Sequence, residues 1–229
     1  MHHDANPLDR PPWSALNSSH AAFSAGNDLA RRYRPEFSPL SAVREVSPPC
    51  LQALSALMQP GEIFGVFADA PVAASGDLAE VVHRRLEQFV YDPREVAAPR
   101  EDFMRLTEAD VPDMMALVKL TDPGPFAVRT IALGDYLGIR RGGRLIAMAG
   151  ERMKFPGFTE ISAVCTHPQQ RGRGLAEALV RTLMRNILGR GDVPFLHIFS
   201  DNEAARALYV KLGFAHRRSL VVSVLKRAG

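Results

Sequence analysis

The chain has few cysteines and no long hydrophobic run. Its 229 residues include two cysteines, Cys50 and Cys165, which lie far apart without metal-ligand spacing. A disulfide would need the fold to bring them together, so we expect two buried, reduced thiols and no metal site. No stretch approaches the roughly 18 apolar residues of a membrane span, and the first residues, Met1-His2-His3-Asp4, lack the basic and apolar regions of a secretory signal. These absences predict a cytoplasmic protein with no membrane partner.

The sequence also has no region in which charge of one sign is concentrated. The formal net charge is +3, with a pI near 9.1. The basic residues are scattered and do not form a stripe interleaved with aromatic residues, so a nucleic-acid partner is not indicated. A hydrophobic content of 46% is enough for one large core or two modest ones and too high for a disordered chain.

Composition divides the chain into three parts. Residues 1–35 are rich in proline and small polar residues, which predicts a poorly structured segment. Residues 36–99 read as a smaller α/β subdomain, with one helix face in Leu51–Met58, a buried strand at Ile63–Ala68 and a short strand at Phe89–Tyr91. The polar, proline-bounded stretch 92–100 is the expected boundary before the main domain at 100–229.

The main domain alternates between strand and helix patterns. Thr107–Asp110 is typical of a helix start, and two strands surround the glycine turn Gly142-Gly143. A third strand covers residues 158–164, followed by a helix with leucines four residues apart, a buried strand at 195–199, a short helix at 202–212 and a last strand at 219–225. This order predicts an α/β (α+β) fold with a mixed, largely antiparallel sheet flanked by helices.

The most informative segment joins the third strand to the long helix. It reads Val164-Cys165-Thr166-His167-Pro168-Gln169-Gln170-Arg171-Gly172-Arg173-Gly174-Leu175-Ala176. Gly172 and Gly174 allow a ligand to approach the backbone, and the helix that follows offers unpaired N–H groups at the positive end of its dipole. Arg171 and Arg173 add positive charge, so this turn is expected to bind a pyrophosphate.

Two common phosphate-binding motifs do not fit this turn. A P-loop would need Lys-Ser or Lys-Thr after its second glycine, and a dinucleotide fingerprint would need glycine or alanine where Glu177 stands. Instead, Gln169–Gly174 matches the Gln/Arg-x-x-Gly-x-Gly/Ala signature of the GCN5-related N-acetyltransferase (GNAT) superfamily. Downstream, Asn202–Phe214 resembles the Asn-x-x-Ala-x-x-Leu-Tyr-x-Lys-x-Gly-Phe motif of the same superfamily. The resemblance is strongest to the FR47-like branch and covers roughly residues 100–229, while residues 36–99 could be a degenerate GNAT-like copy.

The resemblance implies acetyl-CoA as the cosubstrate. In this superfamily the strand before the turn is splayed from its neighbour and its backbone amides bind pantetheine, while the turn holds the pyrophosphate. The cofactor-binding residues implied here are Val164, Cys165, Thr166, Gln169, Arg171, Gly172, Arg173, Gly174, Leu175, Ala176, Asn202 and Tyr209. We expect Asn202 to hydrogen-bond the pantetheine arm.

Two residues are expected to move protons. Tyr209 corresponds to the tyrosine that protonates the leaving thiolate in many members of the superfamily, and a phenol with a reference pKa of about 10 can hold that proton at neutral pH. Glu160 is our candidate for the base that deprotonates the incoming amine, with Glu151 as second choice and transfer through water as a third possibility. An acyl-enzyme on Cys165 is not expected, because nothing nearby depresses its pKa.

The resemblance therefore predicts an acetyl-CoA-dependent acyltransferase. We expect acetyl transfer to a primary amine in a ternary complex, with a small amine or amino acid favoured as acceptor. A noncatalytic acyl-CoA sensor and a protein N-terminal or lysine acetyltransferase remain the alternatives. The acceptor and the oligomeric state cannot be read from the sequence.

Overall fold

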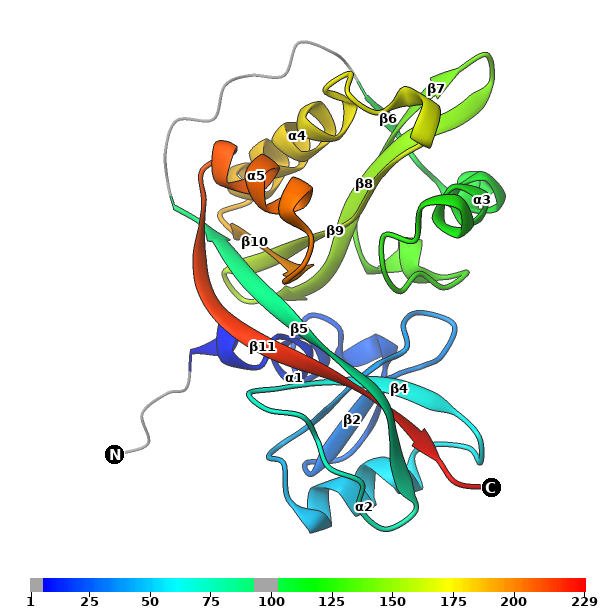
Figure 1. The fold of residues 1–229 in the computed structure, drawn as a ribbon, viewed down its shortest axis with the longest axis vertical. Helices are drawn as coiled ribbons and strands as arrows, with labels where there is room; N and C mark the ends of the chain where they lie inside the picture. Colours follow the sequence, from blue (N-terminus) through cyan, green and yellow to red (C-terminus); the bar gives the residue numbers. More distant parts are fainter. Residues whose placement is uncertain (1–5, 93–102) are drawn as a thin grey trace.

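The computed structural model describes residues 6–92 and 103–229. Within these ranges eleven strands form one mixed sheet in the order β1-β2-β3-β4-β11-β5-β10-β9-β8-β7-β6 (Figure 1). The strands are β1 (Ser24–Gly26), β2 (Ala30–Tyr33), β3 (Leu40–Val43), β4 (Ile63–Ala68), β5 (Leu78–Tyr91), β6 (Met104–Arg105), β7 (Tyr136–Arg141), β8 (Arg144–Phe155), β9 (Phe158–Thr166), β10 (Val193–Phe199) and β11 (Phe214–Arg227). The α-helices are α1 (Pro11–Leu16), α2 (Pro48–Ala56), α3 (Val111–Thr121), α4 (Leu175–Gly189) and α5 (Glu203–Lys211), and short 3-10 turns lie at Pro7–Asp9, Ala21–Phe23, Glu108–Asp110, Thr130–Leu133 and Pro168–Gln170.

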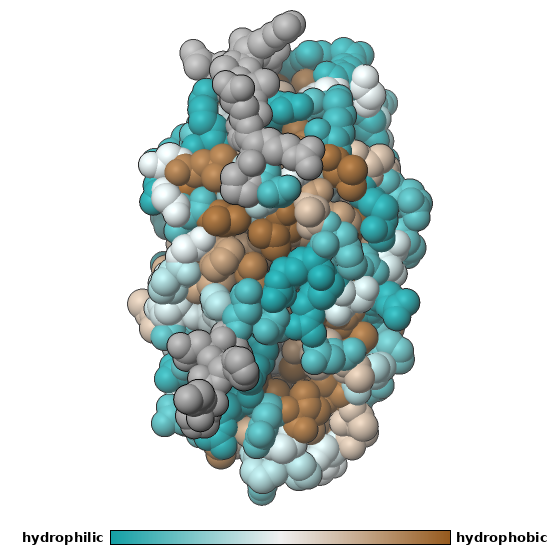
Figure 2. Space-filling model, turned by 90° about the vertical axis from the view of Figure 1, so that its left-hand side faces the viewer, coloured by the Kyte–Doolittle hydropathy of each residue, from teal (hydrophilic) through white to brown (hydrophobic). Residues whose placement is uncertain are grey.

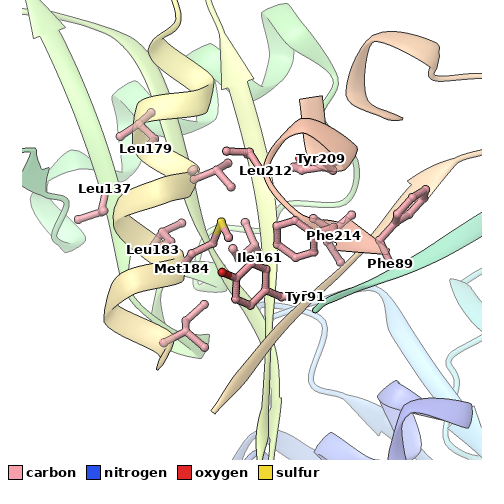
Figure 3. Close-up of a cluster of buried hydrophobic side chains, with 14 of the residues drawn as sticks. Phe89, Tyr91, Leu137, Ile161, Leu179, Leu183, Met184, Tyr209, Leu212 and Phe214 are labelled. Carbon is pink, nitrogen blue, oxygen red and sulfur yellow. The ribbon is translucent and has the colours of Figure 1, made fainter. Parts of the chain in front are cut away.

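Helices cover both faces of the sheet in the C-terminal part. The apolar stripe of α4 packs with α5 and the sheet in a buried cluster that contains Leu179, Tyr209 and Phe214 (Figure 3). On the opposite face, Met114 and Leu117 of α3 pack against β8 in a separate cluster. Because β8 is covered on both faces, most of its residues are buried. The predicted α+β fold with a largely antiparallel sheet flanked by helices is confirmed.

The N-terminal part contains more regular structure than its composition predicts. The sequence predicts little order for residues 1–35, whereas α1, β1 and β2 all lie within residues 6–35. Leu16 and Tyr33 are fully buried there and pack with Phe155 of β8 and Phe195 of β10. The apolar residues of this segment show no local period because they pack against distant strands, which is why the pattern missed them.

Two long strands, β5 and β11, run through both parts of the molecule (Figure 1). They pair with each other from Phe214↔Tyr91 to Arg227↔Leu78, while β10 pairs with the second half of β5 and β4 with the second half of β11. The sequence predicts only a short strand at Phe89–Tyr91, because the earlier residues of β5 are largely polar and exposed. One sheet thus connects the N-terminal strands to the C-terminal part.

The local predictions for the other elements agree closely with the structure. The strand Ile63–Ala68 and the hairpin at Gly142-Gly143 are confirmed, and Thr107 and Asp110 form the reciprocal capping box. The division into three parts remains a prediction, and its boundary, apart from Asp92, lies outside the described residues.

In the described ranges, no helix has both the length and the apolar character needed to cross a membrane. The face shown in Figure 2 carries apolar residues in separate areas divided by hydrophilic ones.

Candidate active site

Strands β9 and β10 run in parallel and then separate. Their pairing covers three positions, from Val193↔Phe158 to Phe195↔Glu160. Beyond that point β10 continues along β5, while β9 continues along β8. The backbone edges of Ile161–Thr166 and Leu196–Phe199 therefore face an opening in the sheet, which can accept an extended ligand between the strands.

A β-bulge lies on β9 at this opening. Met148 of β8 pairs with Cys165 and Gly150 with Ser162, so Ala163 and Val164 stand opposite the single residue Ala149. Ala163 has a φ of 51°, in the left-handed region that alanine rarely adopts. A bulge leaves one residue outside the ladder, so the backbone here is directed toward the opening. A left-handed alanine costs roughly 1–2 kcal/mol, so the bulge holds a strained backbone at the opening.

The turn after β9 is exposed and has the backbone conformation that its glycines allow. Gly172 and Gly174 have φ values of 75° and 76°, and a Cβ added at either would extend into open space. Arg171 and Arg173 are exposed on the same turn. Gly174 is the N-cap of α4, and no side chain of the described residues caps that helix. The first N–H groups of α4 are thus available to an anion, which the pyrophosphate site expected from the sequence would require.

Helix α5 places two predicted residues beside the same opening. The Oδ1 atom of Asn202 accepts a hydrogen bond from the Ala205 N–H at 3.0 Å, which caps the helix and leaves the side-chain NH₂ for a ligand. Tyr209 lies further along the helix, is 6% exposed, and packs edge-to-face on Phe214 with ring centroids 5.8 Å apart. Burial, together with the charge of Glu160, raises the pKa of the Tyr209 phenol, so it holds its proton at neutral pH.

A cavity of about 360 Å³ connects this opening to the N-terminal part of the molecule. We call one end the splayed end; it is lined by Ile161, Ser162, Ala163, Val164, Asn202, Ala205 and Tyr209. We call the other the N-terminal end; it is lined by Leu40, Ile63, Phe64, Phe67, Val82, Val222 and Val224. The loop Asp122–Pro125, which follows α3, also lines the cavity, as do Arg84, Arg152 and His197.

Glu160 does not have the environment of a free base. It is 0% exposed and is not among the residues that line the cavity. Arg152 Nε and Nη2 donate to its two carboxylate oxygens at 2.8 and 2.7 Å, and His197 Nδ1 lies 2.8 Å from Oε1. Burial would raise the pKa of this carboxyl, but the Arg152 charge and the hydrogen bonds from Arg152 and His197 outweigh it and lower the pKa to about 2. The geometry therefore supports a role in holding Arg152 and His197 rather than the proton removal that the sequence predicts.

The hydrogen bonds around His197 determine which nitrogen carries the proton. Arg217 donates to Gln88 Oε1 at 2.8 Å, so the amide nitrogen of Gln88 is the atom that faces Leu8 O at 2.8 Å and His197 Nε2 at 3.1 Å. Nε2 then accepts, and Nδ1–H donates to Glu160. Both ring nitrogens are occupied, which orients the imidazole in the cavity wall.

The sequence interpretation missed Arg152 and His197, and one signal pointed to His197. His197 is the polar residue within the apolar run Phe195–Phe199, and a buried histidine in such a run needs a partner.

The other candidates are not brought into the cavity. Glu151 is fully buried and pairs with Lys154 and Arg190, both at 2.6 Å. The Cys165 side chain lies in the α3 cluster, where burial raises the pKa of its thiol to about 11. A thiol in that environment is not a nucleophile, in agreement with the sequence interpretation.

Comparison with known proteins gives a consistent result. A family model described as FR47-like protein matches residues 136–222. A crystal structure of an acetyltransferase assigned to the GNAT family from Novosphingobium aromaticivorans is 36% identical, superposes with a TM-score of 0.91, and covers 98% of this chain and 100% of its own.

Curated relatives match less of their own length. The N-alpha-acetyltransferase RimI of Mycobacterium tuberculosis is 39% identical over 41% of this chain and 62% of its own. A mycothiol acetyltransferase of Nocardioides is 30% identical over 86% of this chain and 64% of its own. The matches therefore span somewhat less than two thirds of these two relatives.

Proposed function

The chain belongs to the GNAT family of acetyltransferases, and from that premise we propose that it transfers an acetyl group from acetyl-CoA to a primary amine within one ternary complex. The observation that carries this proposal is the conjunction of the splayed strands, the bulge at Ala163 and the uncapped start of α4 along one edge of the sheet. These three features suit an acylated pantetheine arm followed by a pyrophosphate.

The residues present fit this cosubstrate, which would supply an acetyl thioester. We assign the pyrophosphate to the turn from Gln169 through Arg171, Gly172 and Arg173 to Gly174, together with the first N–H groups of α4 at Leu175 and Ala176. The backbone of Val164, Cys165 and Thr166 would hold the pantetheine arm, with the free NH₂ of Asn202 on its other side. Backbone donors at the bulge would polarise the thioester carbonyl as the amine approaches.

The transfer forms one C–N bond and breaks one C–S bond. The neutral amine nitrogen attacks the carbonyl carbon, and the sulfur leaves with the electron pair of the C–S bond. Tyr209 lines the cavity and holds its proton at neutral pH, so we assign it the donation of that proton to the departing thiolate. The nitrogen of the new amide then gives up its extra proton to the Tyr209 phenolate, which restores the acid. Most of the rate enhancement would come from holding the amine beside the polarised thioester.

For proton removal from the ammonium we propose transfer to water in the cavity, without a dedicated side-chain base. Glu160 and His197 are both fully engaged in hydrogen bonds, and Glu151 lies outside the cavity wall. Glu160 then acts as a positioning residue that holds Arg152 and His197 in place.

We propose a small molecule as acceptor. The name of the mycothiol acetyltransferases indicates a small-molecule acceptor for those relatives, and the 360 Å³ cavity is of a size for such a molecule.

The test is thiol release from acetyl-CoA by the purified full-length chain against a pooled library of primary amines. Amine-dependent release that saturates in both substrates would support the proposal. Saturable acetyl-CoA binding without release from any amine or peptide would instead favour a sensor.

A further inference from the structure

We infer that the acceptor is an apolar primary amine that carries no carboxylate beside its amino group. This inference rests on the proposed transferase activity and concerns the N-terminal end of the cavity, whose wall comes from β3, β4, β5 and β11.

The N-terminal end offers an apolar surface. Leu40, Phe64 and Val224 line it together with residues that remain open to solvent. Ile63 is 46% exposed and Val82 is 48% exposed, although both are large aliphatic side chains. Two exposed aliphatic residues at the same cavity indicate a surface that an apolar ligand covers.

The two arginines in the cavity wall are each paired with a carboxylate of the chain itself. Arg152 is held by both oxygens of Glu160. Arg84 donates to both oxygens of Asp201, at 3.2 and 3.3 Å, and its guanidinium stacks 3.4 Å from the centroid of the Phe199 ring. With both arginines paired to carboxylates, the wall offers no unpaired cation for a substrate carboxylate among the described residues.

One negative charge in the wall is unpaired. Among the described residues that line the cavity, Asp122 is the charged side chain for which the structure gives no hydrogen bond or ion pair. Its backbone lies at φ 45° and ψ 60°, at the C-terminal end of α3, and the residue is exposed. A lone carboxylate in the wall attracts an ammonium group and repels a second carboxylate.

These observations together give the substrate class. The ammonium group would be drawn toward Asp122 and lose its proton to water, while the apolar body would lie against Val82 and Leu40. A free amino acid fits this cavity poorly, because its carboxylate would meet Asp122 and find no unpaired arginine in the described wall. The sequence favours a small amine or an amino acid as acceptor, and these observations favour the amine of the two.

The test uses two acceptors that differ by one carboxylate, 2-phenylethylamine and L-phenylalanine, in a steady-state thiol-release assay of the full-length chain. We expect kcat/KM for 2-phenylethylamine to exceed that for phenylalanine by at least about tenfold. We also expect kcat/KM for 2-phenylethylamine to exceed kcat/KM for ethanolamine, which lacks the apolar body, by about tenfold or more.

Asp122→Asn isolates the charge, because asparagine tolerates the left-handed backbone as aspartate does. We expect this variant to raise KM for 2-phenylethylamine by about fivefold. The ratio of kcat/KM for 2-phenylethylamine to kcat/KM for phenylalanine should fall. Val82→Thr should raise KM for the amine about threefold without changing acetyl-CoA affinity, whereas Val81→Thr, its neighbour outside the cavity wall, should leave both unchanged.

The outcomes separate this inference from the proposed function. If phenylalanine is acetylated as well as 2-phenylethylamine, or if Asp122→Asn leaves the preference unchanged, the inference is overturned and the transferase stands. Acetyl-CoA binding with release only for other amines also overturns the inference. If acetyl-CoA does not bind, the proposed function itself fails.

Discussion

The two ends of the cavity differ in what forms their walls. At and beside the splayed end the proposed chemistry belongs largely to the backbone: the bulge at Ala163, which lines the cavity, and the glycine turn and start of α4, which follow β9 outside the cavity wall. At the N-terminal end it belongs to side chains of β3, β4, β5 and β11. Backbone features depend on local sequence and so recur as motifs, whereas a side-chain pocket depends on which strands the fold brings together. We therefore propose that the first end determines the reaction and that the second selects the acceptor.

Removing the Tyr209 hydroxyl should lower the catalytic rate more than any other single substitution at either end. Because general acid catalysis contributes about 10²–10⁴-fold, we expect Tyr209→Phe to lower kcat by about a thousandfold, or about 4 kcal/mol. Acetyl-CoA affinity should change little, since the ring and its contact with Phe214 remain. Steady-state kinetics and calorimetric titration on the same preparation give both quantities. A variant with wild-type kcat would show that the thiolate obtains its proton elsewhere.

The next largest effect is expected when the carboxylate of Glu160 is replaced. Glu160→Gln would leave the buried Arg152 without a counter-charge, so we expect the free energy of unfolding to fall by about 3–4 kcal/mol. The matched control is Glu177→Gln, whose partners Arg181 and Lys211 are solvent-accessible and which should cost less than about 1 kcal/mol. Urea unfolding measures both.

The same variant also distinguishes a positioning residue from a base. Assayed well below its unfolding temperature, Glu160→Gln should keep kcat within about tenfold of wild type, whereas losing a base would lower it by about a hundredfold or more. The folded-state pKa of about 2 lies below the reference value of 4.5, so the stability from this charge is complete above pH 4.5 and is lost as the pH falls toward 2. The stability difference between wild type and variant should shrink in that window.

His20, in the N-terminal part, should make the protein lose stability at a higher pH than Glu160 does. Burial, with a smaller effect from Lys154, lowers the pKa of His20 from 6.5 to about 4. Because the unfolded chain binds this proton first, the free energy of unfolding should fall by as much as about 3 kcal/mol between pH 6.5 and 4. His20→Gln should remove that slope in urea unfolding across this range. An unchanged slope would assign it to other groups.

The smallest expected effect concerns the glycine turn that follows β9. Gly174→Ala places a Cβ at φ 76°, which costs roughly 1–2 kcal/mol, and directs it into the space assigned to the pyrophosphate. We expect acetyl-CoA affinity to fall by about twentyfold with kcat for the bound complex nearly unchanged. Gly189→Ala, which also meets open space but lies at a helical φ, should bind as wild type does. Equal affinities for the two variants would place the pyrophosphate elsewhere.

The contrast between the two ends also explains what the sequence could predict. Gly172, Gly174, Asn202 and Tyr209 lie in short segments whose geometry the local pattern determines. Asn202 and Tyr209 line the cavity, and the two glycines have the left-handed backbone expected of the turn that follows β9. The environment of Glu160 could not be read in this way, because His197 is 37 residues away and reaches it through the parallel pairing of β9 with β10. A carboxylate on a strand is equally compatible with a free base and with a buried ion pair.

The N-terminal end was even less accessible to sequence reasoning. Its wall forms because β11 pairs with both β4 and β5. Val82 and Val222 meet the same cavity only through that register, and neither belongs to a motif. The order of residues 6–35 depends on similar long-range packing, such as that of Tyr33 against Phe155.

The most direct test of the central claim is calorimetric titration of the full-length chain with acetyl-CoA, CoA and ATP. The account predicts one saturable site for acetyl-CoA and for CoA, weakened by Gly174→Ala, and no comparable binding of ATP. Binding of ATP without binding of acetyl-CoA would contradict the assignment of the splayed strands and the glycine turn to an acyl-CoA.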